Sequence, residues 1–438
     1  MTRPFSPLRV TIQQPSLAKY RLPVYRELAR TPGIDLKIVY GKDPGVPNVE
    51  PEGLNASFEP HRHLGLGRHR PFVWQPAQLK YAHRDHTDVL IMVWNTRWLS
   101  LPLALRKARN NGVRTVVWGH GYSKNESPRR AALRKKLGLM GDAILFYSRT
   151  IADQYIDQGV DPNRVFVAPN CLDQQPIQAA RTAWLENPER LEAFRRERGV
   201  PPEAEPILYV SRFDPANRVD LLIRAAAQLA PQRPHLRLHL IGKGDTEIAR
   251  LKALAQELGI ADRVRFLGAI YDENLIAPWF LTAKAFCYPA NIGLSIHHAM
   301  GYGLPVITGD DPSSHNPEIE LIEGGRNGRL FKHAQAPSLA NHLDETLNDE
   351  PQRLRMSQEA HQTVTERHTL QSMTQGSSTP SPARLVGRPS RTIPWEITHT
   401  SLSPDGPSTS SGQAGFFTAG GVVKTTCLPT GTSSLPGQ

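Results

Sequence analysis

Short apolar, β-branched runs alternate with helical patterns along most of this 438-residue chain. Such runs, bounded by polar turns, predict buried strands. Eleven runs fit this pattern, at residues 8–12, 36–40, 89–93, 115–118, 143–147, 165–168, 207–210, 236–241, 264–267, 285–288 and 305–308. Helical patterns lie between them, for example at residues 98–110, 131–139, 219–229 and 246–258. This alternation predicts an α/β fold in which parallel sheets are covered by helices on both faces.

The number of strands indicates two domains, because so many strands are unusual in a single open sheet. We expect one Rossmann-like domain in residues 1–195 and a second in residues 196–373. The boundary is expected within residues 187–206, where a charged helix is followed by the linker-like sequence Gly199-Val200-Pro201-Pro202.

The end of the chain has a different composition. Residues 374–438 contain 39 Ser, Thr, Gly or Pro among 65, with six charged residues and no helical or strand period. That composition is typical of a disordered tail. A translated wrong reading frame has the same appearance, and resequencing the gene after the Met373 codon distinguishes the two.

The net charge of +11 belongs to the first part of the chain. Residues 1–180 hold 26 Lys and Arg against 14 Asp and Glu, whereas residues 181–438 hold 26 against 27. The patch at residues 106–136, with ten basic residues and one acidic, predicts an anionic partner. Within it, residues 129–140 form a basic amphipathic helix candidate, which is either a solvated surface helix or a dock for an anionic membrane surface. No RNA- or DNA-binding motif occurs, so a nucleic acid is not the expected partner.

The chain shows no sign of a membrane span or of a secretory leader. It contains no run of 18 apolar residues, and its start lacks an apolar segment. The three cysteines are too scattered for a disulfide framework. We therefore expect a cytoplasmic protein, with the inner face of the plasma membrane as a candidate location.

The strongest chemical signal lies at residues 288–307, which read as strand, glycine-bearing turn, helix, tight turn and strand. The turn Asn291-Ile292-Gly293-Leu294 would present backbone N–H groups at a helix start, where phosphate binds through unpaired amides. An ordinary turn between a strand and a helix is the alternative interpretation.

Two further loops follow predicted strands. Arg212 comes directly after residues 207–210 and Arg218 opens the next helix, so the two cations could clamp a diphosphate. The loop Gly242-Lys243-Gly244 follows residues 236–241 as a candidate phosphate- or ribose-side loop. Glu247 stands where a dinucleotide fingerprint needs its third glycine, which disfavours a nicotinamide oxidoreductase.

These motifs resemble glycosyltransferase family 4, the retaining family with the GT-B fold of two Rossmann-like domains facing a cleft. The family pattern contains an Arg, a Gly-x-Gly loop, Glu-Gly-x-Gly-Leu-x-x-x-Glu-Ala-Met and Gly-x-Pro-Val-Ile. The positions that match it are Arg212, Gly242, Gly244, Gly293, Leu294, Ala299, Met300, Gly303, Pro305, Val306 and Ile307. The resemblance covers about residues 8–373. It implies transfer of a sugar, with retention, from a UDP- or GDP-sugar to a saccharide or lipid-linked acceptor.

Three positions depart from the family. Ala290 and His298 replace the two glutamates that the resemblance assigns to the sugar and to the ribose, and Asn217 replaces a lysine. Some branches concerned with bacterial surface polysaccharides look similar to this His-Ala-Met version. The resemblance therefore implies an enzyme of polysaccharide or glycolipid biosynthesis, with His298 on the ribose and Arg218 supplying the lost charge. A catalytically degraded nucleotide-sugar-binding scaffold is the alternative.

The first half contributes the remaining candidates. By resemblance, His120, between two glycines after residues 115–118, faces the cleft as the catalytic residue that orients a substrate or accepts a proton. Tyr20 and Arg21 are candidates for contact with the acceptor, with helix capping as the alternative. No Asp-x-Asp occurs in the chain, so no metal is expected. By the same resemblance, residues 351–373 approach a helix that crosses back onto the first domain, and the crossing would lie in residues 374 onward.

Overall fold

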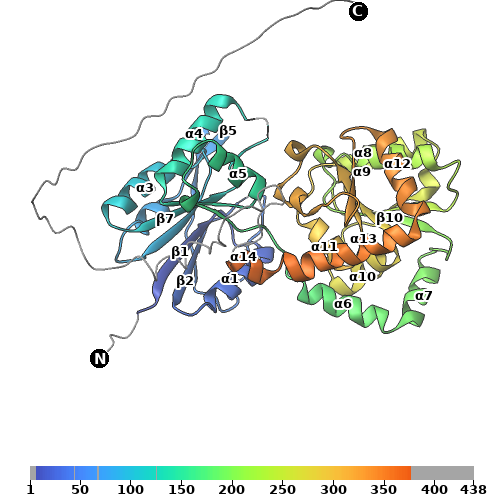
Figure 1. Cartoon of the computed structure of the whole chain (residues 1–438), viewed down its shortest axis with the longest axis horizontal. Coiled ribbons are helices and arrows are strands. Elements are labelled where there is room, and N and C mark those ends of the chain that lie inside the picture. The colour runs from blue at the N-terminus through green and yellow to red at the C-terminus, as the bar shows by residue number, and fades with distance from the viewer. Residues whose placement is uncertain (1–5, 44, 67–68, 125, 376–438) are drawn as a thin grey trace, which may run out of the picture. The chain divides into compact units, whose positions relative to one another are not determined.

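The computed structural model describes residues 6–43, 45–66, 69–124 and 126–375 (Figure 1). Two parallel sheets organise this part of the chain, as predicted. The first sheet has the order β3-β2-β1-β6-β7-β8-β9. Its strands are β1 (Leu8–Gln14), β2 (Ile34–Tyr40), β3 (Ala56–Phe58), β6 (Val89–Val93), β7 (Arg114–Gly119), β8 (Ala143–Phe146) and β9 (Val165–Val167).

The second sheet has the order β12-β11-β10-β13-β14-β15. Its strands are β10 (Glu205–Val210), β11 (Leu236–Ile241), β12 (Val264–Phe266), β13 (Ala285–Cys287), β14 (Val306–Gly309) and β15 (Gly328–Phe331). A separate antiparallel hairpin joins β4 (Arg62–Leu66) to β5 (His69–Trp74). All eleven predicted strands are present, and β3, β4, β5 and β15 are additions that the sequence analysis did not predict.

Both faces of the first sheet are buried, because successive strand residues point to opposite sides. Leu90 and Met92 belong to one apolar core, and Val89 and Ile91 belong to the other. Helices α2 (Pro76–Lys80), α3 (Leu101–Asn110), α4 (Pro128–Met140) and α5 (Arg149–Asp157) contribute to the first of these cores. Helices α1 (Leu22–Ala29) and α14 (Leu370–Gln375) contribute to the second.

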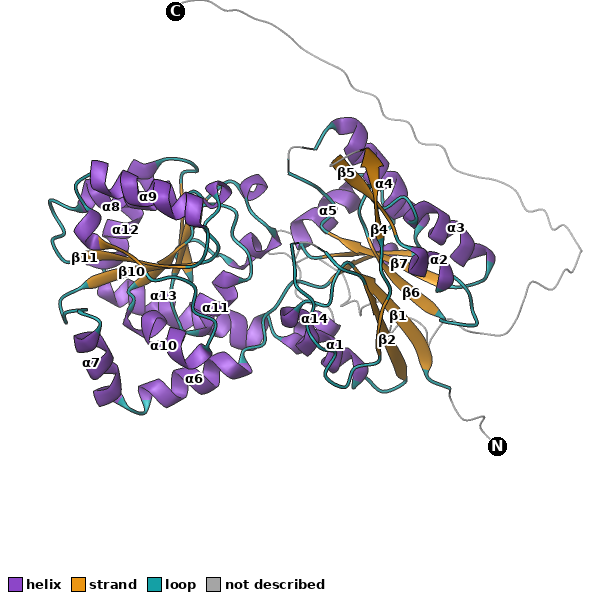
Figure 2. Cartoon of the chain, turned by 180° about the vertical axis from the view of Figure 1, so that it is seen from behind, coloured by secondary structure: helices purple, strands orange, loops and turns teal. Residues whose placement is uncertain are grey.

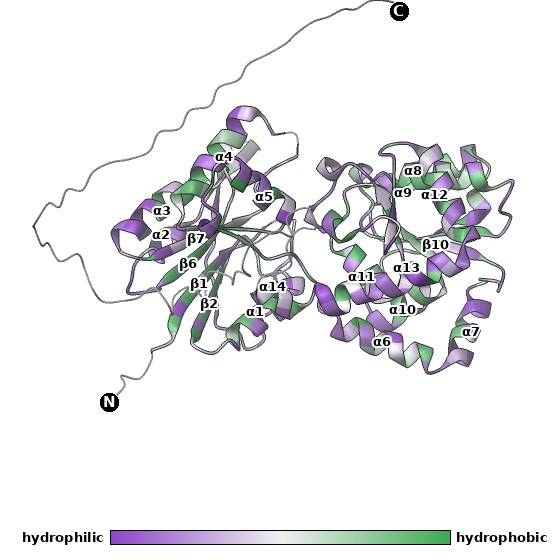
Figure 3. Ribbon diagram, in the orientation of Figure 1, coloured by the Kyte–Doolittle hydropathy of each residue, from purple (hydrophilic) through white to green (hydrophobic). Residues whose placement is uncertain are grey.

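Helix α3 illustrates why these segments are helical. Its buried residues, Leu101, Ala104, Leu105 and Ala108, recur at the spacing of one helical face. Figure 3 shows this pattern along the helices, with apolar residues alternating with polar ones around each ribbon.

The second sheet is likewise covered on both faces, and its buried residues form one continuous core. Helix α8 (Val219–Leu229) packs against α9 (Asp245–Glu257) and α12 (Ala336–Asn348). Helix α10 (Glu273–Thr282) packs against α6 (Gln175–Leu185) and α7 (Pro188–Glu197), and α11 (Ser295–Gly301) packs against α13 (Glu350–Gln362). Figures 1 and 2 show these two groups on opposite faces of the sheet.

The chain passes from one core to the other twice. Cys171 is buried in the core of the first sheet and Ile177 in the core of the second. The domain boundary at residues 195–196 stays a prediction, but the packing itself changes between these two residues. After α13 the chain returns through a π-type turn, Thr363–Arg367, to α14.

Helix α14 corrects the expected place of the crossing. The crossing was predicted in residues 374 onward, but α14 begins at Leu370 and packs against α1. Met373 is 2% exposed in the core of the first sheet, and its sulfur lies 3.4 Å from that of Cys171. Of the predicted tail, Thr374 and Gln375 belong to this helix, and the remainder lies outside the described residues.

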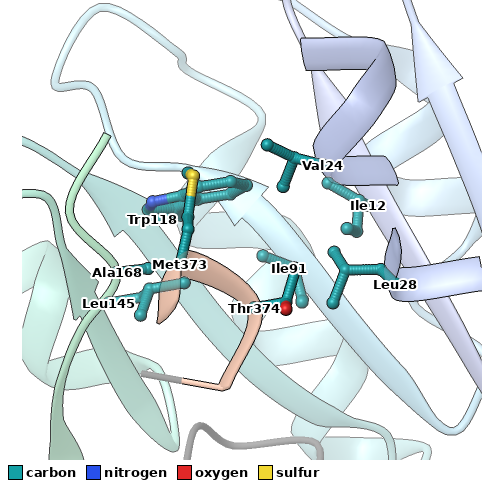
Figure 4. Close-up of a pocket in the computed structure, with 9 residues that line it drawn as sticks. All are labelled: Ile12, Val24, Leu28, Ile91, Trp118, Leu145, Ala168, Met373 and Thr374. Carbon is teal, nitrogen blue, oxygen red and sulfur yellow. The ribbon is translucent and has the colours of Figure 1, made fainter. Parts of the chain in front are cut away.

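An apolar pocket lies beside α14 (Figure 4). It is lined by Ile12, Val24, Leu28, Ile91, Trp118, Leu145, Ala168, Met373 and Thr374. Its lining contains no charged group, so it belongs to the packing of α1 and α14 on the sheet and not to the candidate site described next.

Candidate functional site

Three loops of the second half follow neighbouring parallel strands. Strand β10 pairs with both β11 and β13 in parallel, so the loops after all three strands start from the same edge of the sheet. These loops contain Arg212, the Gly242–Gly244 sequence and the turn at residues 291–294. The carboxyl edge of a parallel sheet is where α/β proteins usually bind ligands.

The turn after β13 offers fewer free amides than the sequence predicts. Asn291 has φ +58°, a left-handed conformation that is uncommon for a residue with a side chain. Its N–H donates to the Ser314 carbonyl over 3.1 Å, and the N–H of Ile292 donates to Nδ1 of His315 over 3.3 Å. Two of the four predicted amide donors are therefore already used. Within the described residues the N–H groups of Gly293 and Leu294 have no hydrogen-bond partner, so these two remain for a phosphate.

The Asn217 side chain connects this turn to the loop after β10. It is 3% exposed, and its amide nitrogen donates to the Tyr209 hydroxyl over 3.0 Å and to the Arg212 carbonyl over 2.7 Å. Its oxygen accepts a 2.8 Å hydrogen bond from the Asn291 side chain. Ala290 is buried, and its N–H donates to the Asn217 carbonyl. Where the resemblance places a lysine, this chain therefore has a buried structural amide.

The two arginines differ in exposure and in their ion pairs. The Arg212 side chain is exposed. Arg218 has φ +52° at the start of α8, and its guanidinium makes two hydrogen bonds to Asp220, of 3.1 and 3.2 Å. Asp220 already balances the charge of Arg218. That Arg218 supplies the lost lysine charge stays a prediction.

The Gly242–Gly244 loop packs directly on the loop that carries Arg212. The N–H of Phe213 donates to the Lys243 carbonyl over 2.7 Å. Gly244 has φ +143°, and a Cβ there would lie 2.4 Å from the Phe213 carbonyl, so only glycine fits. Lys243 is exposed, and its ammonium lies 5.3 Å from the ring centre of Tyr271, which is 79% exposed.

His298 is not a free ligand group. Its Nε2 lies 2.7 Å from Oε1 of Glu273, and the Tyr302 hydroxyl donates to the same oxygen over 2.6 Å. Burial acts to raise the pKa of Glu273, but the hydrogen bonds from His298 and Tyr302 and the nearby charge of Lys19 hold it below its usual range. Glu273 lies 25 residues before His298 on another helix, and no motif in the sequence singles it out.

His120 lies at the carboxyl end of β7, as expected. Its ring is 4.9 Å from that of Tyr147, centre to centre, and its surface is exposed. Gly121 has φ +75°, and a Cβ there would lie 2.7 Å from the Phe146 ring. Although the residue keeps an exposed surface, the protein around it removes part of its solvation and lowers its pKa, and the positive charges of Arg21, Arg134 and Lys124 lower it further. A neutral imidazole at this place is able to accept a proton.

Tyr20 and Arg21 differ in accessibility. Tyr20 is 38% exposed, whereas Arg21 is 7% exposed and donates to the Tyr147 hydroxyl over 2.7 Å. The Arg21 guanidinium also lies 4.8 Å from the Trp118 ring centre. Arg21 is therefore enclosed by aromatic rings instead of reaching outward, and its contact with the acceptor stays a prediction.

Two further groups near these residues were not singled out from the sequence. The Lys124 ammonium donates to Oδ1 of Asn291 over 2.5 Å and to the Ser314 carbonyl over 2.9 Å. Glu318 is 4% exposed, accepts a 2.9 Å hydrogen bond from Asn170, and has its pKa raised by burial. Lys124 thus brings a cation from the first half of the chain to the turn after β13.

The predicted basic helix is α4, and only part of its charge is exposed. Arg134 is 3% exposed and pairs with Glu126 at 2.7 Å. Arg129 and Lys136 are exposed, as are Leu133 and Leu139 at 47% and 37%.

Within the described part of the chain, no helix is long and apolar enough to cross a membrane. The described residues also contain no group of three or more His, Cys, Asp or Glu side chains placed to hold a metal ion.

Together, the described residues offer cations, two amides without a partner among them and an ionised carboxylate along one sheet edge, with a neutral histidine on the first half of the chain. This set suits a ligand that carries both phosphates and hydroxyl groups.

Two glycosyltransferase family models match different parts of the chain. Residues 190–363 match the model of glycosyl transferases group 1, and residues 23–175 match that of glycosyltransferase family 4. A D-inositol 3-phosphate glycosyltransferase of Catenulispora acidiphila is 32% identical over 160 residues, which are 34% of this chain and 35% of the relative. One of Corynebacterium urealyticum is 25% identical over 300 residues, 66% of this chain and 65% of the relative. The matches thus span from about a third to just under two thirds of these relatives.

Solved structures share the fold over most of the chain. A glycosyltransferase from Rickettsia africae has a TM-score of 0.64 at 16% identity, covering 84% of this chain and 96% of that one. HepE of Anabaena, solved in complex with UDP, has a TM-score of 0.63 at 18% identity, covering 84% and 97%.

Proposed function

Because the chain belongs to the family 4 glycosyltransferases with the GT-B fold, we propose that it transfers a sugar from a UDP- or GDP-sugar to a saccharide or lipid-linked acceptor. The observation that carries this proposal is the convergence of exposed Arg212, exposed Lys243 and the turn after β13 on one sheet edge. Cations and unpaired amides are the groups that bind a diphosphate. The complex of HepE with UDP supports the same donor class.

The proposed transfer proceeds with retention and without a metal ion. The protein then has to stabilise the departing diphosphate and orient the acceptor. Arg212 and the amides of Gly293 and Leu294 stabilise the departing diphosphate. His120 orients the acceptor or accepts its proton, because its lowered pKa keeps the imidazole neutral at physiological pH.

The acceptor is proposed to be anionic or held at an anionic surface. The excess of basic residues in the first half of the chain supports this, as do relatives named for inositol 3-phosphate. The exposed face of α4, with Arg129, Leu133, Lys136 and Leu139, suits a peripheral contact with the inner face of the plasma membrane. A vesicle-binding assay at low salt tests this contact. Anionic vesicles should retain the wild type and should not retain the double variant Arg129→Glu/Lys136→Glu.

A catalytically degraded nucleotide-sugar-binding scaffold is the second candidate, favoured by one observation. Ala290, where the resemblance places a sugar-facing glutamate, is buried and offers no polar side-chain atom. A turnover assay separates the two functions. Release of UDP or GDP from a donor sugar in the presence of phosphorylated or lipid-linked saccharides supports the transferase, and donor binding without turnover supports the scaffold.

A further inference from the structure

The Glu273 carboxylate is held at the start of α10 by two donors and keeps one oxygen free. His298 and Tyr302 both contact Oε1, at 2.7 and 2.6 Å. Among the described residues no hydrogen bond reaches Oε2, and the side chain is 28% exposed. A carboxylate that is ionised, oriented and open on one oxygen is ready to accept hydrogen bonds from a ligand.

The aromatic packing around this carboxylate keeps it in place. The Phe280 ring is fully buried and lies 4.6 Å from the His298 ring and 4.8 Å from that of Tyr302, nearly parallel to the latter. Since both hydrogen-bond donors pack on the same buried ring, the orientation of Glu273 is fixed by the core of the second sheet.

The surroundings indicate which part of a nucleotide-sugar meets Glu273. A carboxylate repels phosphate, so it must face a neutral part with hydroxyl groups. Tyr271, two residues earlier, exposes 79% of its surface beside the Lys243 ammonium, and such a ring offers a stacking face to a base. The cations and amides for the diphosphate lie elsewhere on this edge, at Arg212 and at residues 293–294.

We propose that Glu273 binds the ribose hydroxyls of the donor and that His298 and Tyr302 are its positioning residues. The inference rests on the proposed function, because it assumes a nucleoside diphosphate donor. It moves the ribose contact from His298 on α11, where the resemblance places it, to a carboxylate on α10. The presence of a histidine at position 298 is then explained. It donates a hydrogen bond to Glu273, whose carboxylate takes the role of the glutamate that the resemblance places at position 298.

The test compares UDP with 2′-deoxy-UDP, or GDP with 2′-deoxy-GDP, by calorimetric titration of the full chain. The wild type should prefer the ribonucleotide. Glu273→Gln should weaken ribonucleotide binding about tenfold or more, while 2′-deoxynucleotide binding changes little, because a hydrogen bond to an ionised group is lost. The matched control is Glu257→Gln on the exposed side of α9, which should keep the preference.

A second variant keeps the test informative if Glu273→Gln alone alters folding. The double variant Glu273→Gln/His298→Glu returns a carboxylate to α11 and should restore the preference for the ribonucleotide. The inference is overturned if Glu273→Gln retains the full preference, or if the wild type binds both nucleotides equally. Equal binding would leave the proposed function intact, whereas a wild type that binds neither nucleotide would overturn both.

Discussion

The side-chain amide of Asn291 donates a 2.8 Å hydrogen bond to the side-chain oxygen of Asn217. The left-handed turn after β13 is thereby tied to the loop after β10, and Asn217 also holds the Tyr209 hydroxyl and the Arg212 carbonyl. This position therefore organises the site through hydrogen bonds instead of contributing a charge.

Asn217→Ala should destabilise the protein by about 2 to 3 kcal/mol, because it leaves buried polar groups without partners. The free energy of unfolding in urea measures this effect. The exposed Asn163→Ala is the control and should change it little. Equal stability of the two variants would show that the Asn217 network contributes nothing.

His120→Ala should abolish sugar transfer while leaving nucleotide binding measurable. The reason is that His120 lies on the first half of the chain, whereas the proposed phosphate groups lie on the second. Transfer is measured as nucleotide release with acceptor, and binding by calorimetry. Unchanged turnover in the variant would remove His120 from the mechanism.

Folding stability should fall as the pH is lowered below about 6.5, the ordinary pKa of histidine. Burial lowers the pKa of His239 to about 4, of His297 to about 3 and of His315 to about 4. Between these lowered pKa values and about 6.5, the unfolded chain binds protons that the folded chain does not. Each histidine therefore lowers the free energy of unfolding by up to about 1.4 kcal/mol for each pH unit of acidification. The urea midpoint should therefore be lower at about pH 5 than at about pH 7; equal midpoints would mean that these rings are protonated in the folded state.

Met373→Ala should lower the free energy of unfolding by about 2 kcal/mol, near the lower end of the losses measured when a buried methionine is replaced by alanine. Met373 is 2% exposed, but the adjacent apolar pocket already leaves free space around it, which limits the contacts that are lost. The exposed Leu354→Ala on α13 is the matched control. Thermal unfolding compares the two, and an equal effect would mean that α14 adds no stability to the first sheet.

The sequence predicted the sheets well because buried parallel strands are short apolar runs between polar turns. It missed β4 and β5 for a physical reason. Gly65, Gly67 and Pro71 interrupt the run of residues 62–74, and a register shift occurs between Leu64 and Leu66. Strand β15 was missed because it contains only four residues, two of which are glycine and arginine.

The sequence predicted only those parts of the candidate site whose residues are neighbours in the chain. The Gly242–Gly244 loop and the turn at residues 291–294 are continuous motifs, and the structure places them on one edge. The contact between Glu273 and His298 joins two helices with a strand between them, and no spacing in the sequence indicates it. The pairing of Arg218 with Asp220 and the enclosure of Arg21 likewise depend on side-chain orientation.

The proposed function requires that the second half of the chain binds a nucleotide-sugar through its diphosphate. Calorimetric titration of the wild type, Arg212→Ala and Arg218→Ala with UDP- and GDP-sugars measures this binding. We expect the wild type to bind one donor class. Arg212→Ala should weaken binding about tenfold or more, through loss of an exposed cation. Arg218→Ala should weaken it less, because Asp220 already balances that charge. A wild type that binds neither donor class would overturn the proposed function.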